Sequence, residues 1–142
     1  MKIRLARLQD ARGIAHVASA LGYLPHEDDA LILRRLEQLF SSAHDRIWVA
    51  EQNGNVIGWL HAQHAFRAAS ADFIEILGLS VAENARLQGT GRALAEQAKT
   101  WAATEHVTLR VRTNETRDVA KQFYAALGFA LAKKQCVFQR SF

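Results

Sequence analysis

The chain has 142 residues, of which 49% are hydrophobic and 23% charged, and its formal net charge is +4. This composition is typical of a soluble globular protein that is long enough to bury a core. No apolar run approaches the roughly 20 residues that cross a bilayer, and the basic residues are spread along the sequence, so we expect neither a membrane nor a nucleic acid as partner. The single cysteine, Cys136, excludes an intrachain disulfide and favours a cytoplasmic location; its apolar surroundings predict a buried structural thiol.

Apolar residues recur with two periods, and the period separates predicted strands from predicted helices. Alternation predicts a half-buried strand, whereas recurrence every three or four residues predicts an amphipathic helix. Asn53-Gly54 between two alternating runs predicts a hairpin, Asp10 a helix N-cap, and Gly128 the end of the last helix. The predicted strands are 3–8, 46–51, 56–62, 72–81, 106–113, 129–131 and 136–138, and the predicted helices follow Asp10, Asp28 or Asp29, and Gly89, with a fourth at 116–127.

The resulting order is β-α-α-β-β-β-α-β-α-β-β, with no repeat, linker or low-complexity segment. This order predicts a single α/β domain over residues 1–142, with a mixed central sheet flanked by helices. The helix after Gly89 is expected to bury one face, made of Leu94, Ala95, Ala98, Trp101 and Ala102.

The stretch 77–94 reads as an apolar strand, a polar turn, a glycine-spaced loop and a helix. Gly89 and Gly91 allow a tight turn and a close approach of backbone N–H groups to a ligand. The helix start adds unpaired amides and the positive end of its dipole, so the loop predicts a phosphate or pyrophosphate site. A P-loop needs a following Lys-Ser/Thr, which is absent, and a dinucleotide fingerprint needs a third glycine where this chain has Leu94.

The remaining pattern, Arg86-x-x-Gly89-x-Gly91, resembles the acetyl-CoA-binding motif of the GNAT family of N-acetyltransferases, Gln/Arg-x-x-Gly-x-Gly/Ala. A second family signature, Asn-x5-Ala-x2-Phe-Tyr-x2-Leu-Gly-Phe, is similar to a block near the end of the chain. That block is Asn114, Ala120, Phe123-Tyr124 and Leu127-Gly128-Phe129. The resemblance extends to the order of strands and helices, and it implies a single N-acetyltransferase domain over 1–142 with a GNAT-like fold.

The resemblance implies acetyl-CoA as co-substrate, and the residues themselves predict no metal. Loop amides would hold the pyrophosphate, with charge from Arg86 and Arg92, and the N–H of Leu79 would polarise the thioester carbonyl beside a bulge at Gly78. Asn114 would hydrogen-bond the cofactor, unless it only forms a turn. The cofactor-binding residues implied are Leu79, Val81, Arg86, Leu87, Gln88, Gly89, Thr90, Gly91, Arg92, Asn114, Ala120 and Tyr124.

Two residues are candidates for the chemistry. By analogy with the family, Tyr124 would give a proton to the departing thiolate, although a tyrosine on an apolar helix face is often only packing. Glu75, eleven positions before Arg86, lies where the histone-acetylating branch of the family has its general base. The alternative is a sheet-face glutamate that pairs with Arg or Lys, because unpaired burial of a charge is costly.

The acceptor is predicted to be a small-molecule primary amine that attacks the thioester directly in a ternary complex. His61 and His64 would point to opposite faces of a strand, which disfavours a metal site, although His61 is a candidate for the acceptor pocket. The residues expected to border the acceptor groove are Tyr23, His26, Glu27, Asp28 and Asp29. A non-catalytic CoA-binding module, an enzyme acting on protein lysines or N-termini, and a homodimer remain open.

Overall fold

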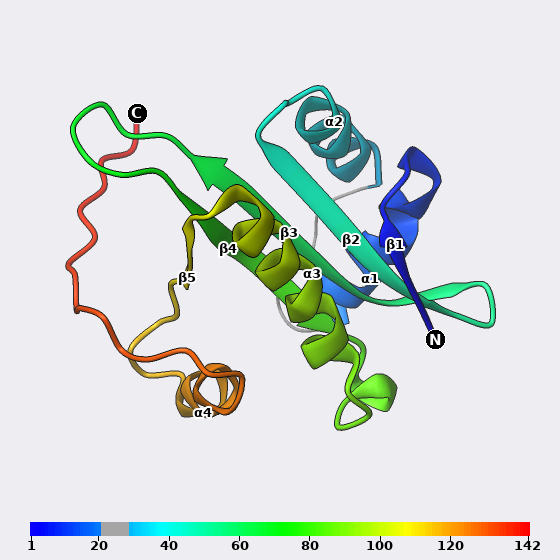
Figure 1. The fold of residues 1–142 in the computed structure, drawn as a ribbon. Coiled ribbons are helices and arrows are strands. Elements are labelled where there is room, and N and C mark those ends of the chain that lie inside the picture. Colours follow the sequence, from blue (N-terminus) through cyan, green and yellow to red (C-terminus); the bar gives the residue numbers. More distant parts are fainter. Residues whose placement is uncertain (21–28) are drawn as a thin grey trace. The chain divides into compact units, whose positions relative to one another are not determined.

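The computed structural model describes residues 1–20 and 29–142, which form two compact units, Met1–Arg112 and Thr113–Phe142 (Figure 1). The first unit contains a five-stranded sheet in the order β1-β2-β3-β4-β5, in which β4 and β5 are parallel and the other neighbours antiparallel. The strands are β1 (Lys2–Leu5), β2 (Asp45–Gln52), β3 (Asn55–Ala65), β4 (Phe73–Val81) and β5 (Thr108–Val111). The helices are α1 (Ala11–Ala20), α2 (Asp29–Phe40) and α3 (Thr90–Glu105) in the first unit and α4 (Asp118–Ala126) in the second.

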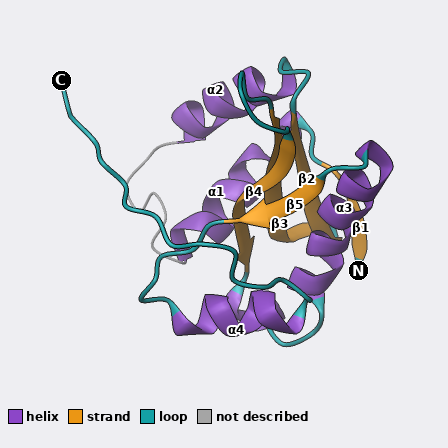
Figure 2. Cartoon of the chain, turned by 60° about the vertical axis from the view of Figure 1, so that its left-hand side comes forward, coloured by secondary structure: helices purple, strands orange, loops and turns teal. Residues whose placement is uncertain are grey.

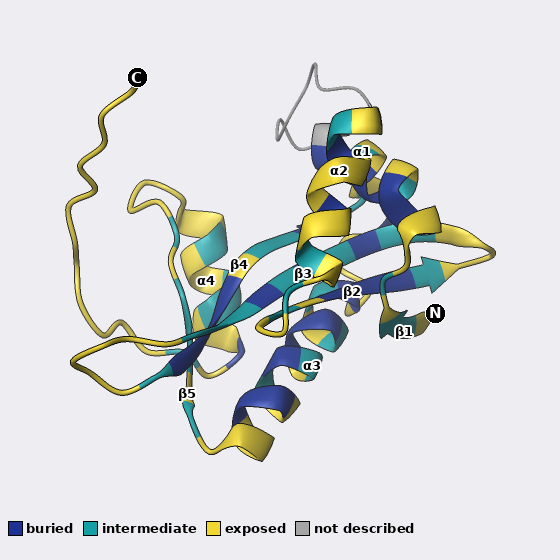
Figure 3. Ribbon diagram, turned by 90° about the horizontal axis from the view of Figure 1, so that it is seen from above, coloured by how far each residue is buried: buried dark blue, intermediate teal, exposed yellow. Residues whose placement is uncertain are grey.

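Helices cover both faces of this sheet, which confirms the predicted α/β architecture. Figures 2 and 3 show α1 and α2 on one face, called here the α1–α2 face, and α3 on the other, the α3 face. On the α1–α2 face, Ile47 and Val49 of β2 pack into a core cluster with residues of both helices. On the α3 face, all five residues of the predicted apolar stripe of α3 are buried. None of the described helices is long and apolar enough to cross a membrane.

The hairpin between β2 and β3 forms where the sequence predicts it. Asn53 and Gly54 both have positive φ, 53° and 79°, which is the requirement of a type I′ turn. Such a turn matches the twist of the two strands and fixes their register. In this register Trp59, His61 and Gln63 alternate with Leu60 and Ala62 along β3.

The prediction of two terminal strands, at 129–131 and 136–138, is wrong. Residues 129–142 form no strand, and Cys136 is exposed rather than buried. A strand needs a neighbour to accept and donate its backbone hydrogen bonds, and the second unit contains one helix and no strand. Runs of three apolar residues next to Lys133-Lys134 carry too weak a pattern to decide between a strand and an extended segment.

Asp10 does not cap α1 in the predicted way, because its carboxylate bonds backwards along the chain. It accepts from the backbone N–H of Arg7 at 2.7 Å and from the two terminal guanidinium nitrogens of Arg4, Nη1 and Nη2, at 2.8 and 2.9 Å. Arg4 also reaches Glu51 on β2 at 3.1 Å, so the network joins β1, the start of α1 and β2. Burial raises the pKa of Asp10, but the bonds from Arg4 and Arg7 outweigh it and lower the pKa below its usual 3.8.

We expect Asp10→Asn to lower the free energy of unfolding by about 1–3 kcal/mol at pH 7, because it removes the charge that Arg4 and Arg7 bond. Since the folded-state pKa is lowered, the carboxylate stabilises fully above pH 3.8 and loses this effect as the pH falls through the folded pKa. Denaturant unfolding against pH measures the difference. The control is Glu96→Gln, in an exposed pair with Lys99, with a change of about 0.5 kcal/mol or less. Equal losses for both variants would contradict the assignment.

Candidate functional site

Strands β4 and β5 separate part-way along their length. Residues Phe73–Ile76 of β4 pair with Thr108–Val111, but β4 runs on to Val81 without β5 beside it. The register of β3 against β4 skips Leu77, which is therefore the extra residue of a β-bulge and is 48% exposed. Residues 77–81 thus have a free backbone edge, called here the open edge, with no strand beside it in the described part of the chain.

The alternation of backbone hydrogen bonds decides which groups lie on the open edge. The N–H of Ala82 donates to the Ile57 carbonyl of β3 at 2.7 Å. In an antiparallel pair the bonded residues alternate, so the main-chain groups of Ser80 face β3 and those of Leu79 and Val81 face away. The side chain of Arg86 donates to the Val81 carbonyl at 3.4 Å, on the side away from β3. The open edge therefore offers the N–H and C=O groups of Leu79 and the N–H of Val81, while the Val81 carbonyl already accepts the bond from Arg86.

Gly78 follows the bulge, at the position where the sequence predicted one. A Cβ at Gly78 would lie 2.7 and 2.8 Å from two ring atoms of Trp59, so the indole occupies the space that a side chain would need. His61, the register partner of Gly78, lies on the same side of β3 as Trp59. Trp59 packs against the α1–α2 core cluster, which places these residues on the α1–α2 face.

The glycine loop links the end of β4 to α3 through two residues of positive φ. Leu87 has φ 63° and Gly89 has φ 82°, and Leu87 is fully exposed. Gly91 has no positive φ and lies in the first turn of α3, so the expected tight turn comes from Leu87 and Gly89 instead. The first helical bond runs from the N–H of Ala93 to Gly89, and no side chain caps the helix start. The amides of residues 90–92 are thus the unpaired donors of this helix.

The other loop residues are placed by local contacts. The hydroxyl of Thr90 is buried and donates to the Ala85 carbonyl at 3.4 Å, whereas the Gln88 amide donates to the Asn84 carbonyl at 3.2 Å. Arg86 and Arg92 are exposed. Arg86 precedes the start of α3 and Arg92 lies in its first turn, so both side chains add positive charge near the positive end of the helix dipole.

We expect Gly89→Ala to destabilise the protein by about 1–2 kcal/mol, because an L-residue pays this cost at φ 82°. No atom lies within 4 Å of the added Cβ, so the cost is conformational rather than steric. Leu87→Gly should have the opposite sign and stabilise by up to about 1 kcal/mol, since its exposed side chain loses no packing. Thermal unfolding of the two variants measures both signs, and a neutral Gly89→Ala would contradict the strained turn.

Glu75 is buried in β4 and ion-paired with β5. Its Oε1 accepts from Arg112 Nε at 2.6 Å and its Oε2 from Arg112 Nη2 at 3.2 Å, and Arg110 Nε lies 3.5 Å from Oε1. The side chain of Glu75 is 5% exposed. The hydrogen bond to Glu75, together with its charge, raises the pKa of the Arg112 guanidinium. Of the two roles considered for Glu75, these contacts favour the sheet-face ion pair over the general base.

A second buried carboxylate, Asp45, holds His61. His61 Nε2 lies 2.7 Å from Asp45 Oδ1, Ser42 donates to Oδ2 at 2.7 Å, and the Gln63 amide lies at 3.3 Å. Burial raises the pKa of Asp45, but the bonds from Ser42, His61 and Gln63 outweigh it and lower the pKa. His61 is thus fixed on the α1–α2 face beside Gly78, and its predicted place in an acceptor pocket stays a prediction.

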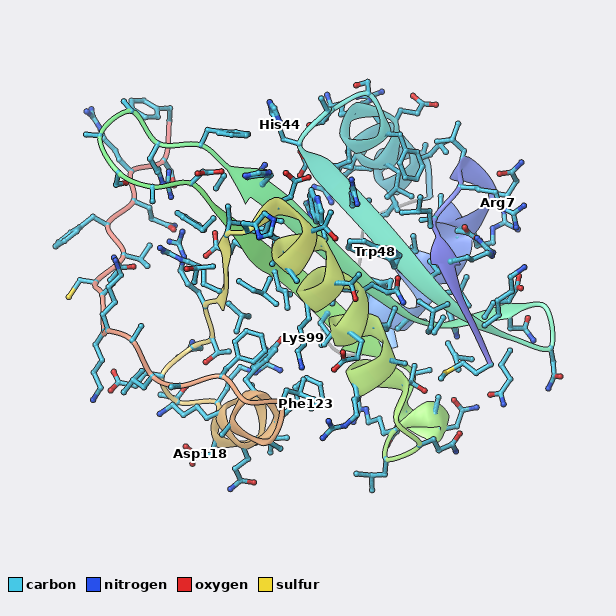
Figure 4. All side chains as sticks on the ribbon, in the orientation of Figure 1. Arg7, His44, Trp48, Lys99, Asp118 and Phe123 are labelled. Atoms are coloured by element: carbon cyan, nitrogen blue, oxygen red, sulfur yellow. The ribbon has the colours of Figure 1, made fainter. Side chains whose placement is uncertain are left out.

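His64 lies on the opposite face, as the strand alternation predicts. It contacts Asp72 at 2.6 Å and the ring of Trp101 of α3 at 6.2 Å between centroids. Its backbone N–H donates to the carbonyl of His44, which is labelled at the start of β2 in Figure 4. No group of three metal-ligating side chains occurs among residues 1–20 and 29–142.

The second unit carries the last three predicted site residues. Asn114 Oδ1 accepts the backbone N–H of Thr116 at 3.1 Å and its hydroxyl at 2.9 Å, which is the turn-forming alternative. Ala120 and Tyr124 lie on α4, half-buried, and the Tyr124 ring contacts Phe123 and Phe129 edge-on. Gly128, at φ 93°, ends this helix as predicted, with the Phe129 N–H bonded to the Tyr124 carbonyl at 3.0 Å.

The structure thus brings eight predicted cofactor residues, from Leu79 to Gly91, onto one strand edge, the loop that follows it and the first turn of α3, which also contains Arg92. Of the predicted acceptor residues, positions 23 and 26–28 lie outside the described residues, and Asp29 begins α2. Arg110 and Arg112 are the partners of Glu75, and the sequence patterns did not identify them. Their spacing of two along a predicted strand was the available signal, because it puts both side chains on one face.

Comparisons with known proteins agree with this geometry. Residues 12–129 match the family model described as "Acetyltransferase (GNAT) family". No curated protein sequence matches significantly. The fold is similar to aminoglycoside 6'-N-acetyltransferase AAC(6')-IG from Acinetobacter haemolyticus, with TM-score 0.84, 17% identity, and coverage of 100% of this chain and 99% of that one.

Two further structures are similar over nearly the whole chain. AAC(6')-Iy in complex with a bisubstrate analogue, CoA-S-monomethyl-acetylneamine, has TM-score 0.84 and 18% identity, covering 99% of this chain and 98% of that one. A protein described as a transcriptional regulator, from Bacillus halodurans, has TM-score 0.85 and 21% identity, covering 98% and 99%. At these identities the likeness shows the fold alone, but the family model covers most of the sequence. The chain therefore belongs to the GNAT family of acetyltransferases.

Proposed function

We propose that the protein transfers an acetyl group from acetyl-CoA to the primary amine of a small molecule, by direct attack in a ternary complex. The observation that carries this proposal is the open edge of β4, which leads directly into the uncapped N-terminus of α3. An unpaired strand edge both donates and accepts hydrogen bonds, as an amide-containing ligand requires, whereas a helix start offers N–H donors and positive charge to an anion. An elongated ligand that has amide groups at one end and a pyrophosphate at the other matches both.

The residues present fit such a ligand. The main-chain groups of Leu79 and Val81 would bond the pantetheine amides as an added strand does, and the amides of the loop and of the first turn of α3 would hold the pyrophosphate. Arg86 and Arg92 would add charge that favours the phosphates. Acetyl-CoA supplies the activated thioester. Asn114 and Ala120 are proposed cofactor contacts from the second family signature.

The proposed chemistry needs no covalent enzyme intermediate. The amine nitrogen forms a bond to the thioester carbon, the carbon–sulfur bond breaks, and the thiolate leaves. The N–H of Leu79 would donate to the thioester oxygen, whose negative charge grows during attack. The Tyr124 hydroxyl would give its proton to the thiolate, and the proton that the ammonium loses leaves to solvent or to a base.

Glu75 is the base that the sequence predicts, and its contacts allow a direct test. Because Arg112 occupies both carboxylate oxygens, we expect Glu75→Gln to keep the acid limb in the pH profile of kcat/KM. The pair would then act in holding β5 against β4. Loss of the acid limb, together with a fall of kcat by about 10²-fold or more, would instead establish Glu75 as the general base.

The proposal as a whole is tested by calorimetry with acetyl-CoA and by thiol release over a panel of amines. Two of the similar structures are aminoglycoside acetyltransferases, so neamine belongs in the panel, together with simple alkyl amines and a lysine peptide. Binding of acetyl-CoA with turnover of a small amine is the expected result. Absence of CoA binding would overturn the proposal. Binding without turnover of any amine would favour a CoA-binding module, and turnover of the peptide alone an enzyme that acts on proteins.

A further inference from the structure

The α1–α2 face carries an excess of guanidinium groups where β4 and β5 separate. Arg110 of β5 and Arg112, the residue that follows β5, share one carboxylate, Glu75, and Arg110 also lies over the Phe73 ring, 4.1 Å from its centroid. Arg67, from the loop between β3 and β4, lies over the same ring at 5.2 Å. These three residues are called here the arginine cluster. Within the described residues, Glu75 is the carboxylate that pairs with Arg110 and Arg112, which leaves a net positive charge.

The guanidinium groups of the cluster have donors to spare. Each guanidinium has five N–H donors, and Glu75 accepts two from Arg112 and approaches one of Arg110. The Arg112 side chain is 55% exposed although its Nε is held by the buried Glu75. An ion pair that fixes one edge of a guanidinium leaves the other edge presented in a constant orientation. A fixed, half-exposed guanidinium is suited to bond a carboxylate or phosphate from solution in a bidentate way.

The position of Arg112 places its guanidinium near the proposed site of acetyl transfer. Arg112 directly follows Val111, the last residue of β5 that pairs with β4, so it lies at the point where the open edge begins. Ile76 is the last residue of β4 that pairs with β5. Leu79, whose N–H is proposed to donate to the thioester oxygen, lies three residues further on, or about 10 Å along the strand. A small acceptor whose amine reaches Leu79 from the α1–α2 face therefore passes next to Arg112.

We propose that the acceptor is a small amine that also carries an anionic group, a carboxylate or a phosphate, which Arg112 binds with support from Arg110. This inference rests on the proposed acetyl transfer and adds the substrate class. The amine is acetylated as described above, and the anionic group takes no part in bond making. The acidic residues expected to border the acceptor groove, at 27–29, do not include any described side chain, whereas the described arginine cluster is positively charged.

The first test compares acceptors that differ in one group. An ω-amino carboxylic acid, its carboxamide, and the alkyl amine of the same length are assayed for thiol release with the wild-type protein. We expect the acid to have a KM about 10-fold or more below that of the carboxamide, and this advantage to shrink as salt is raised. An aminoalkyl phosphate of the same length shows which anion is preferred. Preference for neamine over both anionic amines would overturn the inference while leaving acetyl transfer intact.

The second test removes the guanidinium. Arg112→Gln should raise the KM of the acid about 10-fold and that of the carboxamide less than twofold, with the affinity for acetyl-CoA unchanged. Arg112→Lys keeps the positive charge and a partner for Glu75, so its KM for the acid should lie between those of the wild type and of Arg112→Gln. The matched control is Arg46→Gln, since Arg46 also lies over an aromatic ring, that of Trp101 on the α3 face, at 4.3 Å.

Three outcomes of these assays decide the inference. Equal KM changes for the acid and the carboxamide in Arg112→Gln would contradict it, as would weaker binding of acetyl-CoA by that variant. An effect of Arg46→Gln as large as that of Arg112→Gln would also contradict it. If Arg112→Gln fails to fold because Glu75 loses its partner, Arg112→Lys and the salt dependence of the wild-type protein still decide. Loss of all CoA binding in the wild type would reject the proposed function instead.

Discussion

Replacing the peptide N–H of residue 79 by an ester oxygen is expected to lower kcat by about 10²–10³-fold, the usual cost of losing one oxyanion donor. The side chain of Leu79 is unchanged by this substitution, so packing is kept. The strand ladder is kept as well, because the Leu79 N–H faces the open edge and makes no bond to β3. The effect should therefore fall on turnover, with KM for acetyl-CoA and thermal stability close to those of the unmodified protein.

An ester at Val81 is the matched control, since its N–H lies on the same open edge two residues further on. There the proposed partner is a ground-state amide of the cofactor, so the ester should weaken binding about fivefold and leave kcat nearly unchanged. Semisynthetic proteins with each ester, assayed by stopped-flow thiol release and calorimetry, separate the two roles. Similar losses of kcat at both positions would contradict the assignment of Leu79 as the oxyanion donor.

The parts of the site that depend on local sequence could be predicted. The alternation in β4, the bulge near Gly78, the loop and the apolar stripe of α3 all follow from neighbouring residues, and the structure has each of them. Local patterns identified one of the two turn residues, Gly89, but not the other. Gly91 was expected in the turn and lies in the helix, whereas Leu87, whose side chain gives no sign of positive φ, is in it.

The spacing of Arg110 and Arg112 predicts that they share a face, but that they meet Glu75 depends on a parallel register, which local patterns do not give. Glu75 and Arg110 are 35 positions apart in sequence, and they become neighbours only when α3 returns the chain beside β4 with Phe73 opposite Thr108. A shift of one residue would have turned both arginines to the α3 face. For the same reason, the failure of the terminal strands was not visible in the sequence: residues 136–138 have strand-forming side chains, but the second unit gives them no strand to pair with.

Tyr124→Phe is expected to lower kcat by about 10²-fold or more, because the thiolate would lose its proposed proton donor. The substitution removes one oxygen atom and keeps the ring, whose edge-on contacts with Phe123 and Phe129 lie 5.0 and 5.5 Å between centroids. α4 should therefore stay folded and the affinity for acetyl-CoA should change little. A leaving thiolate of lower pKa needs less help from an acid, so a thioester donor with a more acidic thiol should recover part of the lost rate.

Phe123→Leu is the matched control for packing in α4, since it removes the ring contact between Phe123 and Tyr124 and keeps the hydroxyl. We expect it to lower stability more than Tyr124→Phe does, with a smaller effect on kcat. Steady-state kinetics with acetyl-CoA and with the thioester of the more acidic thiol measures kcat for both variants, and thermal unfolding measures their stability. If Tyr124→Phe turns over at the wild-type rate, or loses rate equally with both donors, the hydroxyl is not the proton source for the thiolate. Water would then be the remaining acid, and Tyr124 would act through packing alone.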